Sequence, residues 1–286
     1  MSRPFRLALP SKGRLHAPAL ALARDAGVEI DVTGRTLHAH CSQWDIEVLL
    51  ARADDIPAWA QDGAVEAAIA GRNQIAESEA AVDELAPLGF GRCALQVAVR
   101  DGSGLEAVEQ LDGRRVATSH PRTTRRFLAE RGLDVEVTAI HGSVELAPRL
   151  DAADAIVDLV STGDTLRANG LVPIATVLES EAVLLARREL DARQRRVVDE
   201  LATVVRSVVA ARDRRYLMLN APDASLERIV RLLPGLDSPT VLPLAAAGMH
   251  AVHAVVPRSQ VIELLPPLRA AGARSILVLP IDNLIP

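Results

Sequence analysis

The feature that most restricts how this chain can fold is a repeated alternation of short apolar runs with amphipathic, helix-period segments over residues 5–160. The apolar runs end in loops that contain Gly, Ser or Asp, as at 115–118, 135–140 and 155–160. Alternation of this kind indicates βα units and a largely parallel sheet, with ligands bound at the carboxyl ends of the strands. We therefore expect the chemistry to lie in the loops that follow these strands.

The C-terminal part of the chain follows a different order of elements. Its predicted order, β-α-β-β-α-β, is typical of a ferredoxin-like domain. This domain carries no evident nucleophile, so we interpret it as regulatory. The predicted elements are a long amphipathic helix at 191–215 that leads into the domain, strands at 216–220, 240–244, 251–256 and 275–279, and helices at 225–233 and 260–271.

The charge of the chain argues against a general nucleic-acid role. Lys and Arg total 32 against 37 for Asp and Glu, a formal net charge of −5, and the basic residues are scattered along the chain. Phosphate backbones are bound by concentrated Lys and Arg, which this chain lacks. A small anionic ligand needs only a local positive site and stays possible.

The sequence also gives no sign of export, membrane insertion or a zinc site. Residues 1–7 lack the apolar core of a signal peptide, and no run reaches the roughly 18 apolar residues that span a bilayer. The two cysteines, Cys41 and Cys93, are too few for a disulfide framework, and the seven histidines show no metal-ligand spacing. We expect a cytoplasmic protein that does not contact membranes.

The most informative stretch is the apolar strand that ends at Val160 and runs into Ser-Thr-Gly-Asp-Thr. Backbone N–H groups at a helix start, together with Ser and Thr hydroxyls, form a concave site for a phosphate. Asp154 and Asp158, on one predicted strand face, would lie beside it and accept hydrogen bonds from ribose hydroxyls. Alternatively, this composition meets only the needs of an ordinary loop and helix cap. The predicted phosphate-binding residues are Ser161, Thr162, Gly163, Asp164 and Thr165.

Two other loops could complete a site. Ser11-Lys12-Gly13-Arg14 follows the first strand and places two cations in a glycine-containing loop, which suits a polyphosphate. A solvated loop is the alternative. Gly142-Ser143-Val144-Glu145 follows another strand, with Ser143 as a predicted cap and Glu145 in the first helical turn; a capped helix without function is the alternative there.

At these motifs the sequence resembles the long-form ATP phosphoribosyltransferases, the first enzymes of histidine biosynthesis. The matching segments run through nearly the whole chain, and so long an ordered series is not expected by chance. They are LPSKGRL at 9–15, DDIPAWAQDG at 54–63, VATSHPRTTRRFLAERG at 116–132, GSVELAPRL at 142–150, ADAIVDLVSTGDTLRANGLV at 153–172, YLMLNAP at 216–222, LLPGLDSPTVLPLA at 232–245 and GARSILVLPID at 272–282.

The resemblance implies a reaction in which N1 of the ATP adenine attacks the anomeric carbon of 5-phosphoribosyl 1-diphosphate and expels pyrophosphate. Adenine N1 is already a lone-pair nucleophile, so the enzyme mainly orients two polyanions and offsets developing charge, as Mg²⁺ and a few cations can do. The resemblance implies that residues 161–165 hold the 5-phosphate and that Asp154 and Asp158 face the ribose. The other implied residues are Lys12, Gly13 and Arg14 near the nucleotide or diphosphate, with Arg35, Arg52 and Glu145 as further candidates.

The resemblance also implies a fold. We expect an α/β catalytic region of two lobes, like a type II periplasmic binding protein, and a C-terminal ferredoxin-like (ACT-like) domain. Lobe I is predicted at 1–96 and completed by 176–212, lobe II at 97–175, and the regulatory domain at 213–286. The family implies that histidine, as feedback inhibitor, binds this domain between subunits of a homo-oligomer, dimer to hexamer. The matching effector positions are Asn220, Leu236, Ser238, Thr240 and Ser275.

Fold alone does not separate such a transferase from a non-catalytic two-lobed protein that binds an anionic metabolite. The paired Asp154 and Asp158, which a simple anion site does not need, favour the transferase. A third interpretation is an inert subunit retained as a sensor, and the intact phosphate-loop residues argue against it.

Overall fold

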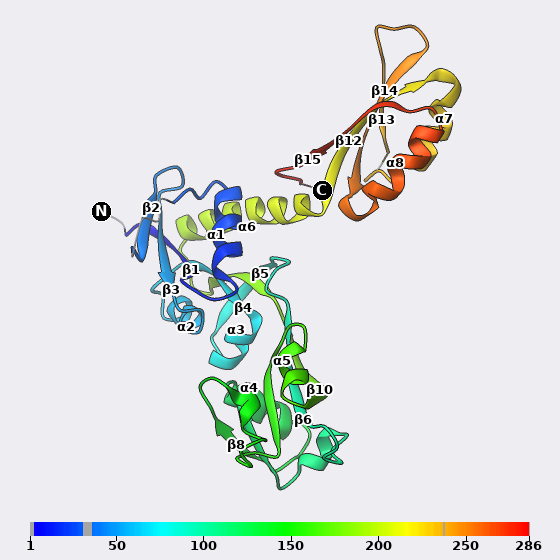
Figure 1. The fold of residues 1–286 in the computed structure, drawn as a ribbon. Helices are drawn as coiled ribbons and strands as arrows, with labels where there is room; N and C mark the ends of the chain where they lie inside the picture. The colour runs from blue at the N-terminus through cyan, green and yellow to red at the C-terminus, as the bar shows by residue number, and fades with distance from the viewer. Residues whose placement is uncertain (1–2, 31–35, 237, 286) are drawn as a thin grey trace. The chain divides into compact units, whose positions relative to one another are not determined.

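The computed structural model describes residues 3–30, 36–236 and 238–285 (Figure 1). The chain divides into two compact units, Met1–Ala202 and Thr203–Pro286. The division falls within the 21-residue helix α6 (Ala192–Arg212). The apolar stripe that predicts this helix, which includes Leu201, Val205 and Val208, is buried.

The described residues of the first lobe form a six-stranded sheet with short helices. Its strands are β1 (Phe5–Pro10), β2 (His38–Cys41), β3 (Ile46–Ala51), β4 (Ala67–Gly71), β5 (Val82–Pro87) and β11 (Ala182–Arg187), and its helices are α1 (His16–Asp25), α2 (Ile56–Gln61) and α3 (Arg72–Ser78). The strand order is β2-β3-β1-β4-β11-β5, with β1 parallel to β3 and β4 and the other neighbours antiparallel. Every residue of β4 is buried, as expected for a central strand covered on both faces.

The second lobe, which is described without a gap, has a five-stranded sheet. Its strands are β6 (Cys93–Arg100), β7 (Arg115–Thr118), β8 (Glu136–Ala139), β9 (Ala155–Val160) and β10 (Leu171–Ser180), and its helices are α4 (Pro121–Ala129), α5 (Asp164–Ala168) and the 3₁₀ turns η1 (Val108–Leu111) and η2 (Val144–Leu146). The strand order is β10-β6-β9-β7-β8, with β7 parallel to β8 and β9.

The two sheets share one arrangement, which confirms the two-lobed α/β fold. The order β3-β1-β4-β11 of the first lobe corresponds to β8-β7-β9-β6 of the second, since in each the first three strands are parallel and the fourth is antiparallel to the third. Those antiparallel strands correct the prediction of a largely parallel sheet. Short apolar runs give no information on strand direction, so the sequence pattern could not separate them.

The chain crosses between the lobes twice, at positions that differ from the predicted ones. The first sheet ends at Pro87 and the second begins at Cys93, and the return lies at Glu181, between β10 and β11. The predicted boundaries were 96/97 and 175/176. They fall inside β6 and β10, which pair with each other from Leu171/Arg100 to Ser180/Cys93 and therefore both belong to the second sheet (Figure 1).

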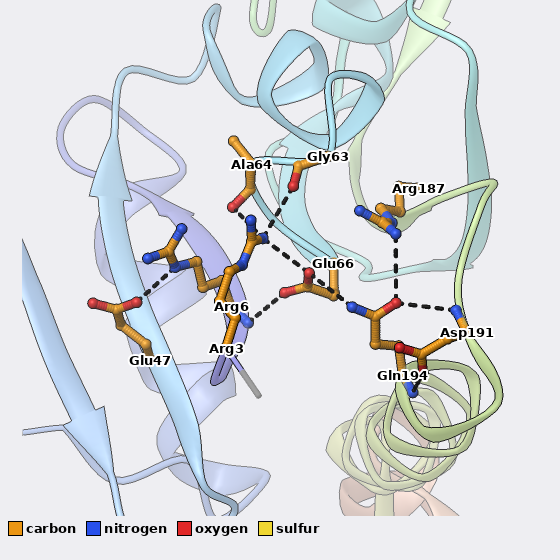
Figure 2. A network of polar contacts seen from close by, with 9 residues as sticks. All are labelled: Arg3, Arg6, Glu47, Gly63, Ala64, Glu66, Arg187, Asp191 and Gln194. Atoms are coloured by element: carbon orange, nitrogen blue, oxygen red, sulfur yellow. Dashed lines mark hydrogen bonds and ion pairs between the residues drawn. The ribbon is translucent and has the colours of Figure 1, made fainter. Parts of the chain in front are cut away.

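A buried carboxylate joins three elements of the first unit (Figure 2). Glu66 is 1% exposed and accepts hydrogen bonds from Arg6 N–H (2.7 Å), Arg3 Nη2 (2.9 Å) and Gln194 Nε2 (3.2 Å). Gln194 also forms a reciprocal cap with Asp191 at the start of α6. The carboxylate thus connects β1, the approach to β4 and the first turn of α6, which fixes the return segment to the first sheet.

The described residues of the second unit have the predicted ferredoxin-like order of strands and helices. Its elements are β12 (Arg214–Pro222), α7 (Asp223–Leu232), β13 (Thr240–Pro243), β14 (Met249–Pro257), the 3₁₀ turn η3 (Arg258–Gln260), α8 (Val261–Ala270) and β15 (Arg274–Pro280). The antiparallel sheet has the order β13-β14-β12-β15. Alternate residues of β12 and β14 are buried, and they pack with α7 and α8 into one apolar core.

Among the described residues, no helix combines the length and the apolar character needed to cross a bilayer.

Candidate active site

The predicted phosphate loop lies on the surface of the second lobe, where β9 leads into α5. A pocket of about 270 Å³ is lined by Glu145 and by the continuous stretch 158–166. Gly163 has φ +77°, the left-handed region that favours glycine, and a Cβ there would lie 2.9 Å from Arg167 Nη1. Residues 161–165 thus line a surface pocket and are not part of the apolar core. Because α5 has only five residues, its dipole contributes little, and the groups that the loop offers to an anion are its amides and hydroxyls.

Asp164 orders this loop from within. Its carboxylate accepts hydrogen bonds from Thr162 Oγ1 (2.6 Å) and from Arg167 Nη2. The Thr162 hydroxyl, and after it the Arg167 guanidinium, hold the pKa of Asp164 below its ordinary value. Asp164 stays ionised and shapes the loop, while Ser161 and Thr165 line the same pocket.

Asp158 lies at the base of the same pocket in a partly buried position. Its Oδ1 accepts the N–H of Leu159 at 2.8 Å and lies 3.5 Å from Ser119 Oγ. Burial raises the pKa of Asp158, with the charge of Glu145 adding to the rise and the Leu159 N–H opposing it. A carboxylate in this position can accept hydrogen bonds from a polyhydroxyl ligand in the pocket.

The structure contradicts the predicted placing of Asp154 beside Asp158. Asp154 precedes β9, accepts the N–H of Arg115 at 2.9 Å, and lies 3.7 Å from Arg115 Nε. It lines a separate surface pocket with Arg100, Asp101 and Arg114. Four residues along a strand span about 13 Å, so two carboxylates at that spacing cannot hold one ribose.

The loop after β1 meets the phosphate loop through one arginine. Arg14 Nη1 donates to Ser161 Oγ at 2.8 Å, and its Nη2 donates to Cys93 Sγ at 2.7 Å. Lys12 and Gly13 precede it in the same exposed loop, and Arg52 follows β3, which is parallel to β1. Carboxyl ends of parallel strands share one sheet edge, so Lys12, Arg14 and Arg52 emerge from that edge. Arg35, the other predicted cation, lies outside the described residues.

Residues of both lobes line a second, larger pocket of about 670 Å³ that the sequence reasoning missed. Ser119 and His120 follow β7 directly and could have been found by the rule that ligands bind after parallel strands. They were missed because their loop contains no glycine or cation run. The lining residues are Asp54, Gln74, Glu77, Ser78, Ser119, His120, Pro121, Arg122, His141 and Gly142.

One predicted helix cap is absent. Ser143, before η2, has φ +46° and makes no side-chain capping bond, although Glu145 in the same turn does line the phosphate-loop pocket.

No group of three His, Cys, Asp or Glu side chains in the described ranges could hold a metal ion.

Comparison with known proteins places these loops in a family. The profile described as ATP phosphoribosyltransferase (HisG) matches residues 52–207, and the profile of the HisG C-terminal domain matches residues 211–283. The ATP phosphoribosyltransferase of Cytophaga hutchinsonii is 39% identical over 285 residues, which cover all of both chains. That of Haloarcula marismortui is 43% identical and covers 98% of this chain and all of its own.

The chain belongs to the ATP phosphoribosyltransferase family.

A solved member of the ATP phosphoribosyltransferases supports the fold. The ATP phosphoribosyl transferase (HisG:HisZ) complex from Thermotoga maritima superposes with a TM-score of 0.61 at 23% identity, and covers 71% of this chain and 98% of its own. In the present chain, the C-terminal unit corresponds to the HisG C-terminal domain. The expected family and the expected long form, with both parts in one chain, are thus confirmed.

The predicted effector residues of this chain do not all lie together. Asn220 on β12 and Ser275 on β15 lie on neighbouring strands. Thr240 begins β13, at the opposite edge of the sheet and three strand spacings, or about 14 Å, from β15. Leu236 and Ser238 lie in the loop before Thr240 and are exposed. A single site that uses all of them would need a second subunit.

Proposed function

We propose that this chain transfers the 5-phosphoribosyl group from phosphoribosyl diphosphate to N1 of ATP and releases pyrophosphate, as the first step of histidine biosynthesis. The observation that carries the proposal is the pocket at 158–166, which combines loop amides, hydroxyls and one partly buried carboxylate and is met by Arg14. Relatives named ATP phosphoribosyltransferase that match the chain over its full length support the same activity.

The roles of the residues follow from their chemistry. The amides and hydroxyls of Ser161–Thr165 bind the 5-phosphate, while Asp158 accepts hydrogen bonds from the ribose hydroxyls. Arg14 and Lys12, from the facing loop, neutralise the diphosphate, with Arg52 and Glu145 at the margins. Because adenine N1 needs no deprotonation, orientation and charge stabilisation are sufficient, and no general base is required.

Mg²⁺ fits this site as an ion carried by the substrate. The described residues offer no cluster of three ligand side chains, and Mg²⁺ commonly keeps several waters and binds substrate phosphates with one or two carboxylates. When bound, the ion would neutralise charge that develops on the leaving pyrophosphate.

The larger pocket supports a nucleotide subsite. Its position between residues of both lobes, next to Ser119 and therefore to Asp158, suits the second substrate. We further propose that the C-terminal domain binds histidine as a feedback inhibitor between subunits of a homo-oligomer in the cytoplasm. The separation of Thr240 from Ser275 supports a shared site of this kind.

The test is an assay of the purified chain with ATP, phosphoribosyl diphosphate and Mg²⁺. We expect pyrophosphate and a product with the mass of ATP plus one phosphoribosyl group, modified at N1, as seen by mass spectrometry. Omission of either substrate is the control. A complete absence of product across a range of pH and salt would reject the transferase and favour a two-lobed anion-binding protein, which binding measurements with phosphoribosyl diphosphate would then detect.

A further inference from the structure

A line of side-chain hydrogen bonds runs from helix α3 in the first lobe to Asp158 in the second. Asn73 Nδ2 lies 3.1 Å from His120 Nε2. His120 Nδ1 lies 2.9 Å from Ser119 Oγ, which in turn lies 3.5 Å from Asp158 Oδ1. The last contact is long, and bonds of this kind at active sites often shorten when substrate is bound.

The direction of these bonds is fixed at the Asn73 end. Asn73 N–H donates to Ser180 Oγ at 3.0 Å, and the Ser180 hydroxyl donates to Asn73 Oδ1 at 2.9 Å. With Oδ1 engaged as an acceptor, the amide NH₂ faces His120 and can only donate. His120 Nε2 is therefore an acceptor and carries no proton.

The tautomer of His120 follows. A neutral imidazole without a proton on Nε2 carries it on Nδ1, and this N–H donates to Ser119 Oγ. The Ser119 oxygen then has its own hydrogen available for Asp158 Oδ1. Each donor in the line points toward Asp158.

The surroundings keep His120 neutral and fixed. His120 is 9% exposed and Asn73 is 2% exposed, and burial lowers the pKa of His120 below its ordinary value of 6.5. The negative charges of Glu77, Asp158 and Asp54 oppose this lowering of the pKa without reversing it, and the positive charge of Arg14 adds to it. Arg122 and His141 line the larger pocket together with His120. A proton on Nε2 would also face the Asn73 NH₂ and break the contact.

Further hydrogen bonds hold the segment around His120. Its N–H donates to Thr118 Oγ1 at 2.9 Å, and Thr118 donates to the Val157 carbonyl at 2.7 Å. The Glu77 carboxylate of α3 accepts the N–H groups of Arg122 and Thr123, both at 2.9 Å, at the start of α4. These contacts restrict His120 to one position relative to β9 and α3.

We propose that His120 is a positioning residue of the transfer reaction, which acts through Ser119 to direct a hydroxyl hydrogen at Asp158 and so hold that carboxylate toward the ribose. The proposal rests on the proposed function. The Ser119 hydroxyl also opposes the rise in the pKa of Asp158 that burial causes. Loss of the hydroxyl should therefore make Asp158 easier to protonate and weaken catalysis on the acidic side.

Three single variants separate this role from a purely structural one. Ser119→Ala and His120→Gln should each lower kcat/KM about 10-fold, the effect of one hydrogen bond to a charged group. Both should shift the acid limb of the kcat/KM profile to higher pH. His120→Asn keeps an amide N–H where Nδ1–H was, so it should lose less than about 3-fold and keep the limb in place. Equal losses for His120→Gln and His120→Asn, with no shift of the limb, would overturn the proposal.

The double variant tests whether His120 acts through Ser119. Ser119→Ala combined with His120→Gln should be no slower than Ser119→Ala alone, because the hydroxyl through which His120 acts is already gone. Multiplied losses would show that His120 acts by another route and would overturn the proposal.

An NMR measurement on the full chain gives a readout that needs no activity. The imidazole signal of His120 is identified as the one that is missing in His120→Asn. Its ¹⁵N chemical shifts should show a neutral ring with a proton on Nδ1 at pH 7.5. A proton on Nε2, or a charged ring, would overturn the proposal even when the wild-type chain is active. An inactive wild-type chain with the expected tautomer would instead overturn the proposed function, and with it any role of His120 in transfer.

Discussion

Asp158 and Asp154 lie in one short segment, but the structure gives them different surroundings. Asp158 lines the phosphate-loop pocket and is partly buried, whereas Asp154 pairs with Arg115 at the other end of β9. Asp158→Asn should lower kcat/KM about 10- to 100-fold through loss of charged hydrogen bonds to ribose. Asp154→Asn, the matched control, should leave kcat/KM unchanged. Equal losses in both variants would restore the paired-carboxylate interpretation.

Asp158 should also make the stability of the fold depend on pH. The raised pKa of Asp158 means that the folded state binds its proton more tightly than the unfolded state, so above the ordinary value of 3.8 ionised Asp158 destabilises the fold. Asp158→Asn should thus unfold at the same or a higher temperature at pH 8, and any gain should vanish as the pH falls toward 3.8. A large destabilisation at pH 8 would contradict this account.

At the scale of elements, the Glu66 carboxylate joins β1, the approach to β4 and α6 (Figure 2). Glu66→Ala leaves the Arg6 N–H and Gln194 without their shared acceptor in a buried site. We expect the free energy of unfolding to fall by about 3 kcal/mol, as measured by urea denaturation. Glu47→Ala, which removes a more exposed ion pair with Arg6, should lower it by less than about 1 kcal/mol. Similar values for the two variants would show that burial does not decide the effect.

At the scale of the whole molecule, we predict from the C-terminal domain that histidine changes the transferase rate. Free histidine should lower the rate, and Asn220→Ala should raise the histidine concentration needed for half-inhibition by about 10-fold or more, the effect of one or two lost hydrogen bonds. Arg231→Ala, on the exposed side of α7 where Arg231 pairs with Glu227, is the control and should behave like the wild type. A rate that does not change with histidine would remove the sensor role.

Local order along the chain was enough to predict most elements and one loop. The runs at 115–118 and 155–160 are strands in the structure with those bounds, and the loop at 161–165, where a phosphate site was predicted, lines a pocket. The order of the C-terminal domain was also predictable, because its strands alternate inward and outward residues. These features depend on residues that are neighbours in sequence.

Contacts between distant residues were decided only by the tertiary structure. Arg14 and Ser161 are 147 positions apart, and Asn73 reaches Ser180 across 107 positions and His120 across 47. The direction of β6, β10 and β11, and with it the two lobe crossings, also depends on which strands pair. Residue type and local period carry no information on such pairings, because many partners have the same chemistry. The sequence therefore determined which loop lines the pocket, and the tertiary structure decided which carboxylate and which histidine stand beside it.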